Sequence, residues 1–410
     1  MPAQETSLMS HLTLRPFSIS LALVAIALTA TLAPPAYAQT YSVVFNFDDT
    51  NSTGAQPEGG VVVDPSGNLY STTELGGANQ SNYGTIFKLA PNGTETVLHT
   101  FIFTSNSSDG ESPVAGPIRD SAGNLYGTTG FAGTHGMGTI YEIDSAGTES
   151  ILHNFSGGAA DGAYPGFGNL ILDGAGNLYG TTEEGGAFNT GTAYQLSPTG
   201  VFTVLYSFSN GTDGGFPYSS LVMDSSGNLY GTAIQGGNGG SNGGGVIFRL
   251  SPNGSGGYQE TVLHSFKGGT DGRNPVAGPA LNPAGHLYGN TEQGGSGGCG
   301  VIYEAGTNGG EKVLYAFSAL GSGDGCVPVG VLLFQGGTLY GTTGSGGAFG
   351  QGTIFSISST GVETILHSFN PATDGGAPNG GVVRGPHGAL YGTASIGGSS
   401  NQGTVFKIVP

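Results

Sequence analysis

One seven-residue phrase recurs along the whole of this chain. The copies and close variants of "GNLYGTT" stand at 67–73, 123–129, 176–182, 227–233, 285–291, 337–343 and 388–394. Their tyrosines follow one another at intervals of 56, 53, 51, 58, 52 and 51 residues. A period of this length, kept from one end to the other, indicates an array of similar structural units.

Each period contains four short strand-like runs separated by turn residues. In the second period the runs lie at 115–120, 124–129, 138–143 and 149–155. No segment shows a convincing helical period, and four strands in about 50 residues are typical of one blade of a β-propeller. The sequence therefore predicts an all-β, seven-bladed β-propeller with four strands per blade, as a single domain over residues 39–410.

The two ends of this domain each supply one unmatched strand. Residues 403–408 have the pattern of a third strand with no fourth strand after it, and residues 41–47 have the pattern of a fourth strand. We expect the N-terminal strand to complete the seventh blade. That pairing would close the ring and leave no sheet edge exposed.

The repeated phrase is interpreted as a turn followed by the second strand of a blade. An aspartate stands six residues before the tyrosine in four copies, at Asp64, Asp120, Asp173 and Asp224. Asp-x-x-Gly-Asn is hairpin chemistry, and the Leu and Tyr that follow should face the two neighbouring blades. The next Gly should allow close backbone approach where the blades converge. The phrase is thus expected to be structural.

Four sub-motifs recur in register: Leu-Tyr-Gly-Thr-Thr, Gly-Thr-Ile-Phe, Thr-Val-Leu-His-Ser-Phe and Asp-Gly-x-x-Pro. Together they resemble the GloVer (Gloeo/Verruco) tandem repeat of exported bacterial proteins of the choice-of-anchor type, over essentially all of 41–410. The resemblance implies export and a propeller-like array, and it carries no established activity. The chain departs from the family in that nothing after Phe406 has the pattern of a sorting tail.

Residues 1–38 have the pattern of a secretory signal peptide. Arg15 precedes an apolar run over 19–32, and Ala36-Tyr37-Ala38 predicts cleavage after Ala38. We expect a secreted protein, periplasmic or extracellular, with no transmembrane span in the mature chain. Lys and Arg number 9 against 27 Asp and Glu, and the net charge of −18 argues against nucleic acid as a partner.

Candidate ligand residues fall on one face of the ring. The loops between strands two and three share this face with the loops that enter the next blade, and both sets are long and polar. Asp-Gly-x-x-Pro recurs there at Asp109, Asp161, Asp213, Asp271, Asp324 and Asp374. These aspartates either hold the loops by accepting backbone amides or bind Ca²⁺ near the channel mouth. Their repetition in almost every blade favours the turn interpretation, and no other cofactor is expected.

Histidines share one position in the fourth strand. The residues at this position are Phe45, His99, His153, Tyr206, His264, Tyr315 and His367. Because a position that accepts Phe does not define a ring of metal ligands, we expect these side chains to pack flat on the outer strand. The remaining histidines, His135, His286 and His387, have no second ligand at a useful spacing.

Cys299 and Cys326 are the only cysteines. Cys299 just precedes the third strand of the fifth blade, and Cys326 lies in the loop after that blade's fourth strand. Strand parity places both at the loop-rich face, and an exported protein with an even number of cysteines favours a disulfide. The alternative is two independent buried thiols.

Three classes of function remain open. The first is a monomeric, non-catalytic binding propeller for a glycan, a cell-surface polymer or a protein. The second is a polysaccharide-acting enzyme with carboxylates as acid and base, and the third is a purely structural surface component. Residues that repeat in every blade offer no unique catalytic pair. The one adjacent pair in a Gly-rich loop is Glu183-Glu184, whose side chains we expect to diverge.

Overall fold

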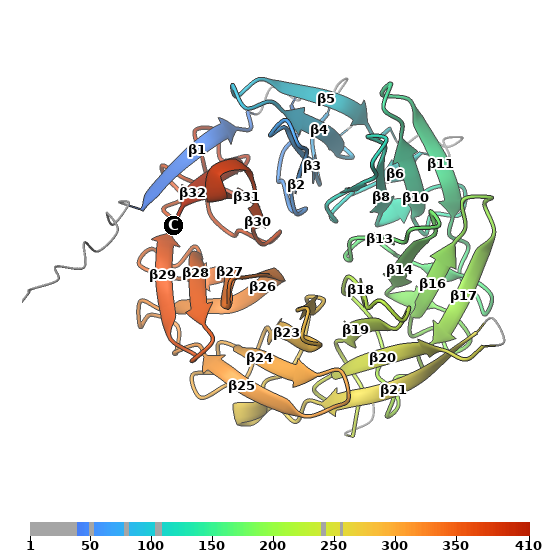
Figure 1. Cartoon of the computed structure of the whole chain (residues 1–410). Coiled ribbons are helices and arrows are strands. Elements are labelled where there is room, and N and C mark those ends of the chain that lie inside the picture. Colours follow the sequence, from blue (N-terminus) through green and yellow to red (C-terminus); the bar gives the residue numbers. More distant parts are fainter. Residues whose placement is uncertain (1–38, 49–52, 78–81, 103–108, 239–242, 255–256) are drawn as a thin grey trace, which may run out of the picture. The chain divides into compact units, whose positions relative to one another are not determined.

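Seven four-stranded antiparallel sheets form the blades of a ring (Figure 1). The computed structural model describes residues 39–410 apart from 49–52, 78–81, 103–108, 239–242 and 255–256, and residues 39–410 form one unit. The predicted signal peptide, 1–38, lies outside the described residues. The described residues contain no α-helix, and their short 3-10 turns are η3 (Gly269–Asp271) and η4 (Pro386–Gly388). The prediction of an all-β, seven-bladed propeller is confirmed.

Within each blade the four strands lie side by side, with the first nearest the centre of the ring and the fourth at the outside (Figure 1). Blade 1 comprises β2 (Val62–Val63), β3 (Leu69–Thr73), β4 (Thr85–Leu89) and β5 (Glu95–Thr100), and blade 2 comprises β7 (Ile118–Arg119), β8 (Leu125–Thr129), β10 (Thr139–Ile143) and β11 (Glu149–Asn154). Blade 3 comprises β13 (Ile171–Leu172), β14 (Leu178–Thr182), β16 (Thr192–Leu196) and β17 (Phe202–Ser207). Blade 4 comprises β18 (Val222–Met223), β19 (Leu229–Ala233), β20 (Val246–Pro252) and β21 (Tyr258–Ser265).

The remaining blades include the one that joins the two ends of the domain. Blade 5 comprises β22 (Ala280–Leu281), β23 (His286–Thr291), β24 (Val301–Gly306) and β25 (Glu311–Ala316). Blade 6 comprises β26 (Gly325–Gln335), β27 (Thr338–Gly346), β28 (Thr353–Ser358) and β29 (Glu363–Ser368). Blade 7 comprises β30 (Val383–Arg384), β31 (Leu390–Ala394), β32 (Thr404–Val409) and β1 (Thr40–Asn46). Two small sheets pair β6 (Gly110–Glu111) with β9 (Phe131–Ala132) and β12 (Gly162–Ala163) with β15 (Glu184–Gly185).

The innermost strand of blade 2 is shorter than the sequence predicts. In blade 2 the run expected at 115–120 is reduced to β7, Ile118–Arg119. Pro113 and Pro117 precede β7 and have no amide to donate to a ladder, so pairing begins only after them. The other three strands of this blade lie within one residue of the expected ranges.

β1 and β32 pair antiparallel, as the two unmatched strands predict. The register runs from Thr40 opposite Val409 to Asn46 opposite Thr404, with a bulge between Val43 and Phe45. Beyond the strand, the Phe47 amide donates to the Gly403 carbonyl at 3.0 Å. Figure 1 shows β1 as the outer strand of the last blade.

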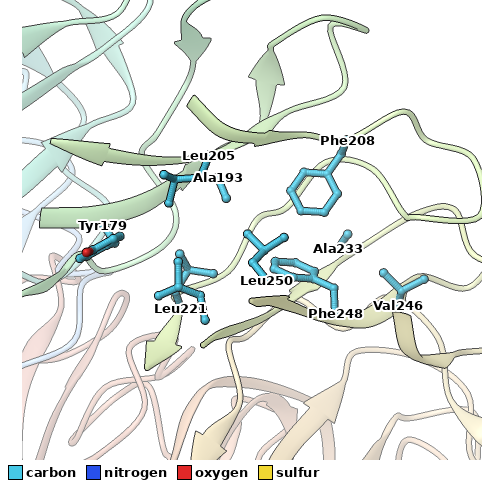
Figure 2. Packing of buried hydrophobic residues seen from close by; sticks show 10 residues of the cluster. Tyr179, Ala193, Leu205, Phe208, Leu221, Ala233, Val246, Phe248 and Leu250 are labelled. Atoms are coloured by element: carbon cyan, nitrogen blue, oxygen red, sulfur yellow. The ribbon is translucent and has the colours of Figure 1, made fainter. Parts of the chain in front are cut away.

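The hydrophobic core lies between blades, with one buried cluster at each of the seven interfaces. Figure 2 shows the interface where Phe208 of blade 3 packs against Phe248 and Leu250 of blade 4. The motif residue Tyr179 belongs to this cluster, whereas its neighbour Leu178 belongs to the cluster with blade 2. The two motif side chains therefore face opposite blades, as expected.

The motif aspartate holds the turn that precedes the second strand. Asp173 Oδ1 accepts the amides of Ala175 and Asn177 at 2.9 and 2.8 Å. Its Oδ2 accepts the Asn177 side-chain amide at 2.8 Å and the Tyr179 hydroxyl at 3.1 Å. The same bonds recur at Asp64 and Asp224, so the motif tyrosine both fills the core and completes the turn.

Glycine is needed at the motif position after the tyrosine, but for a different reason from the one expected. Gly180 lies opposite Tyr194 on the neighbouring strand β16 of its own blade. A Cβ at Gly180 would come within 2.5 Å of the Tyr194 hydroxyl, and Tyr194 is fully buried. The glycine makes room for this aromatic ring rather than for an approaching blade.

Cys299 and Cys326 form the expected disulfide. Both lie in the buried cluster between blades 5 and 6. Cys326 is already part of β26, the innermost strand of blade 6, rather than of a loop belonging to blade 5. The bond therefore links two neighbouring blades.

Candidate functional site at the channel mouth

Every loop that enters a blade carries one residue in an unusual backbone conformation. The residue before the motif proline has a φ between 50° and 61° in all seven blades, at Gln56, Ser112, Tyr164, Phe216, Asn274, Val327 and Ala377. A positive φ is costly for a side-chain-bearing residue, and a following proline favours extended backbone instead. The Tyr164 amide donates to the Met137 carbonyl of the preceding blade at 2.9 Å. This bond ties the loop to its neighbour and positions the segment after the proline.

The residue that follows the motif proline is valine in three blades and a different residue in each of the other four. In chain order these residues are Glu58, Val114, Gly166, Tyr218, Val276, Val329 and Asn379. Blade 3 also has one residue more than its neighbours between the proline and the first core position, Leu170, and Phe167 lies in this longer segment. The sevenfold repeat is therefore broken at this level of the ring.

A cavity of about 270 Å³ opens where these segments meet. Its walls come from all seven blades and include Glu58, Val114, Phe167, Asn169, Tyr218, Val276, Glu292, Val329 and Asn379. Because the innermost segment of every blade contributes, the cavity lies at the axis of the ring. Cavities at such positions are where ligands are usually held.

Two aromatic rings form one wall of the cavity. Phe167 and Tyr218 stack with their centroids 3.8 Å apart and their planes 15° from parallel. Phe167 is 37% exposed although it is a large apolar side chain. Burial, together with Glu183, Glu58 and Glu292, raises the pKa of Tyr218 well above its usual range. Its hydroxyl therefore stays protonated and can donate a hydrogen bond.

Carboxylates surround the aromatic pair. Glu58 Oε2 accepts a hydrogen bond from the Asn379 side-chain amide at 3.3 Å. Burial, and secondarily Glu74, raises the pKa of Glu58, while burial and then Glu184 raise that of Glu183. Glu183 directly precedes β15, on which Glu184 lies, and the expected divergence of their side chains stays a prediction. The cavity combines an apolar face with acids and amides.

The sequence pattern missed Glu58, Phe167, Tyr218 and Glu292, which line the cavity, and singled out Glu183 only as part of an adjacent pair expected to diverge. Glu292 follows the second strand of blade 5, at a position that is also Glu in blades 1 and 3 (Glu74 and Glu183); the remaining blades have Gly130, Ile234, Gly344 and Ser395. For Glu58, Phe167 and Tyr218 the signal that could have found them is departure from the repeat, since functional residues need not obey the packing that all blades share. The search for repeated carboxylates pointed instead to the aspartates of Asp-Gly-x-x-Pro.

Those six aspartates lie beside the outermost strands and not at the channel mouth. Each carboxylate faces the shared fourth-strand position of its own blade, in the pairs Asp109–His99, Asp161–His153, Asp213–Tyr206, Asp271–His264, Asp324–Tyr315 and Asp374–His367. The distance from Asp161 Oδ1 to His153 Nε2 is 3.1 Å, and Asp161 Oδ2 accepts the Ser156 amide at 3.0 Å. Ca²⁺ binding by these aspartates stays a prediction.

This pairing corrects the interpretation of the histidines. The blade with Phe45 at the shared position is the one that has Thr53 in place of the aspartate. A hydrogen-bonding side chain therefore stands opposite every aspartate, and an apolar one stands where the aspartate is absent. The four histidines are hydrogen-bond partners as well as packing groups. His286, for which no second ligand was expected, lies with its Nδ1 atom against the Glu304 carboxylate.

A glutamate of the following blade approaches most of these pairs. It stands near the start of the fourth strand, at Glu149, Glu260, Glu311 and Glu363, and Glu95 has the same position in the blade that follows Phe45, where no such pair exists. In all five the Oε1 atom is buried with no hydrogen-bond partner among the described residues. Burial, with Asp213 nearby, raises the pKa of Glu260 to about 7, and burial with Asp324 does the same for Glu363. At the two remaining interfaces Phe202 stacks on His153 and Tyr41 stacks on His367.

These glutamates predict a pH-dependent stability. Between the ordinary pKa of 4.5 and about 7, the folded chain retains protons at Glu260 and Glu363 that the unfolded chain has lost. The free energy of unfolding should therefore fall as the pH rises through this window, and the loss should be complete above pH 7. Replacing both by Gln, which resembles the neutral acid, should flatten this part of the profile. Urea unfolding at a series of pH values measures it, and an unchanged slope in the double variant would contradict the prediction.

The fold and the cavity define a class: a tandem-repeat β-propeller with a ligand-sized cavity on its axis. The chain belongs to the Gloeobacter/Verrucomicrobia repeat family, which matches residues 32–239 and 237–410. The resemblance seen in the four sub-motifs is thereby confirmed. A comparison with curated proteins finds no match.

Several solved structures share the fold at low identity. The extracellular domain of a proposed one-component system from B. thetaiotaomicron has a TM-score of 0.55 and 10% identity, covering 89% of this chain and 39% of that one. A proposed 6-phosphogluconolactonase from Bacteroides uniformis has a TM-score of 0.51 and 14% identity, with 80% and 88% covered. PorZ, a surface component of the type-IX secretion system of Porphyromonas gingivalis, has a TM-score of 0.51 and 14% identity, with 88% and 47% covered. These likenesses concern the fold alone.

The described residues include no helix with the length and apolar character needed to span a membrane.

Proposed function

We propose that the protein is an exported binding module whose channel mouth holds a neutral carbohydrate chain. The observation that carries this proposal is the stacked Phe167–Tyr218 pair, placed in a cavity that also presents carboxylate and amide groups. Both aromatic residues stand where the repeat is broken, so the packing shared by all blades does not account for them.

A sugar ring has an apolar face of C–H groups and a rim of hydroxyls. The exposed side of Phe167 offers an apolar surface for such a face. Glu58 and Glu292 can accept hydrogen bonds from hydroxyls, while Asn169 and Asn379 can both donate and accept. The carboxylates and the net charge of −18 would repel an acidic polymer, which favours a neutral one.

The test is a glycan array with the full domain, followed by calorimetry on the carbohydrate it selects. Phe167→Ala and Tyr218→Ala should each raise the Kd at least about tenfold, because each removes a ring of the stacked wall. Phe188→Ala is the matched control: this blade 3 side chain is 60% exposed and is not among the residues that line the cavity. An array without binding, or equal affinities in all variants, would contradict the proposal.

A second candidate function is hydrolysis of the bound chain. The observation that favours it is the raised pKa of Glu58, caused first by burial and then by Glu74. A carboxyl whose pKa is raised holds its proton more tightly, as the general acid of a glycosidase must. Release of reducing ends by the unaltered protein, lost in Glu58→Gln with binding retained, would identify an enzyme. Binding without any product identifies a binding module.

A further inference from the structure

Two interfaces between blades bring together a histidine, an aspartate and a glutamate. His264, Asp271 and Glu311 meet between blades 4 and 5, and their equivalents between blades 1 and 2 are His99, Asp109 and Glu149. In each set one ligand atom from each residue lies within 4.8 Å of the other two. Below, these sets are called the blade 4/5 triad and the blade 1/2 triad.

The blade 4/5 triad is held by backbone on both sides of the interface. His264 lies on β21, and its Nε2 is 3.2 and 3.3 Å from the two Asp271 carboxylate oxygens. Asp271 ends the short turn η3, and its Oδ2 accepts the Lys267 amide at 2.7 Å. Glu311 is the first residue of β25 in the next blade. The histidine and aspartate side chains are only 18% and 20% exposed, so water competes weakly for them.

The charges of the triad call for a positive partner. Two carboxylates and one imidazole nitrogen converge, and the Glu311 Oε1 atom is buried without a hydrogen-bond partner among the described residues. Neighbouring carboxylates repel each other unless a proton or a cation lies between them. In the blade 1/2 triad the Glu149 Oε1 atom is likewise buried without a hydrogen-bond partner among the described residues.

We propose that each triad binds one divalent transition-metal ion of the Zn²⁺ class, which links the two blades. One imidazole nitrogen and two carboxylate oxygens form a suitable ligand set for such an ion, and water can complete the tetrahedron. The ion replaces the proton that the carboxylates otherwise share. Because the ligands come from two blades, binding stabilises the interface and hence the folded chain.

The chain itself contains incomplete versions of the triad. At two interfaces a tyrosine replaces the histidine, in Tyr206–Asp213–Glu260 and Tyr315–Asp324–Glu363. At two others the histidine and aspartate are present, but Phe202 or Tyr41 occupies the place of the glutamate. Within the described residues the full set thus occurs at two interfaces, and the incomplete versions provide substitutions that the fold already accepts.

The experiment is equilibrium dialysis of the full domain against Zn²⁺, with the bound metal counted by elemental analysis. The unaltered chain should retain two ions. His264→Tyr, which copies the chain's own tyrosine version, should retain one, and His99→Tyr combined with His264→Tyr should retain none. Zn²⁺ should raise the Tm of the unaltered chain, a chelator should reverse the rise, and the double variant should respond to neither.

His153→Tyr is the matched control, because its interface has Phe202 in place of the glutamate; this variant should still retain two ions. If a tyrosine variant fails to fold, Glu311→Gln serves instead and should also remove one ion. Absence of retained Zn²⁺ in the unaltered chain, or unchanged retention in the double variant, overturns the proposal. The outcome is independent of whether a carbohydrate binds at the channel mouth.

Discussion

Removing residues 39–47 should destabilise the domain by on the order of 5 kcal/mol or more, because it takes away a whole outer strand and a core side chain. β1 supplies the ladder that covers β32, and Phe47 is fully buried against Phe87 with ring centroids 5.2 Å apart. Without them the edge of β32 is left open and the cluster between blades 7 and 1 loses one side.

The measurement is denaturant unfolding of the shortened chain beside a chain that begins at Gln39. Phe47→Ala, which keeps the strand and removes only the ring, should show an intermediate loss. Since β32 would be unprotected, the shortened chain should also associate at high concentration, and light scattering can detect this. Coincident unfolding curves for the shortened and control chains would show that β1 contributes nothing to the ring.

The second large effect is expected at the interface between blades 5 and 6. Phe355 is fully buried there and lies 5.3 Å, centroid to centroid, from Phe317 of blade 5. Phe355→Ala should cost about 3–5 kcal/mol of unfolding free energy, because it removes the ring and leaves a cavity. Phe349→Ala, the same substitution in the same blade at a side chain that is 55% exposed, should cost less than about 0.5 kcal/mol. Guanidinium unfolding of both variants checks the difference, and equal losses would contradict an inter-blade core.

The fold was predictable because the same strand and turn motifs recur in every blade. The pairing of β1 with β32 follows from one unmatched strand at each end, and the roles of Asp173 and Tyr179 follow from a turn signature. Repetition turns weak local signals into a consistent one. The disulfide also followed, since strand parity places Cys299 and Cys326 at the same face of the ring and the cysteine count is even; that Cys326 lies on β26 of the next blade was not predicted.

The candidate sites were not predictable in the same way. The cavity depends on Glu58, Phe167 and Tyr218, whose common feature is that they depart from the repeat. The triads depend on how one blade is set against the next, which brings Glu311 to Asp271 across 40 residues of sequence. Local patterns describe a blade but not the offset between blades. The motif also did not show that Gly180 makes room for the Tyr194 ring, because this contact depends on which residues of β14 and β16 lie opposite each other.

The order in which the chain is made gives the β1–β32 pair a further consequence. Blades 1 to 6 are each built from one continuous stretch of sequence, so each can assemble soon after its own residues emerge. Blade 7 combines Thr40–Asn46 with Thr404–Val409, so its outer strand is synthesised first and paired last. Throughout elongation β1 remains an unpaired, partly apolar strand, available to a neighbouring nascent chain or to a chaperone. Completion of the ring is therefore a late step that depends on full-length synthesis, and a stalled or truncated chain would carry an open β1.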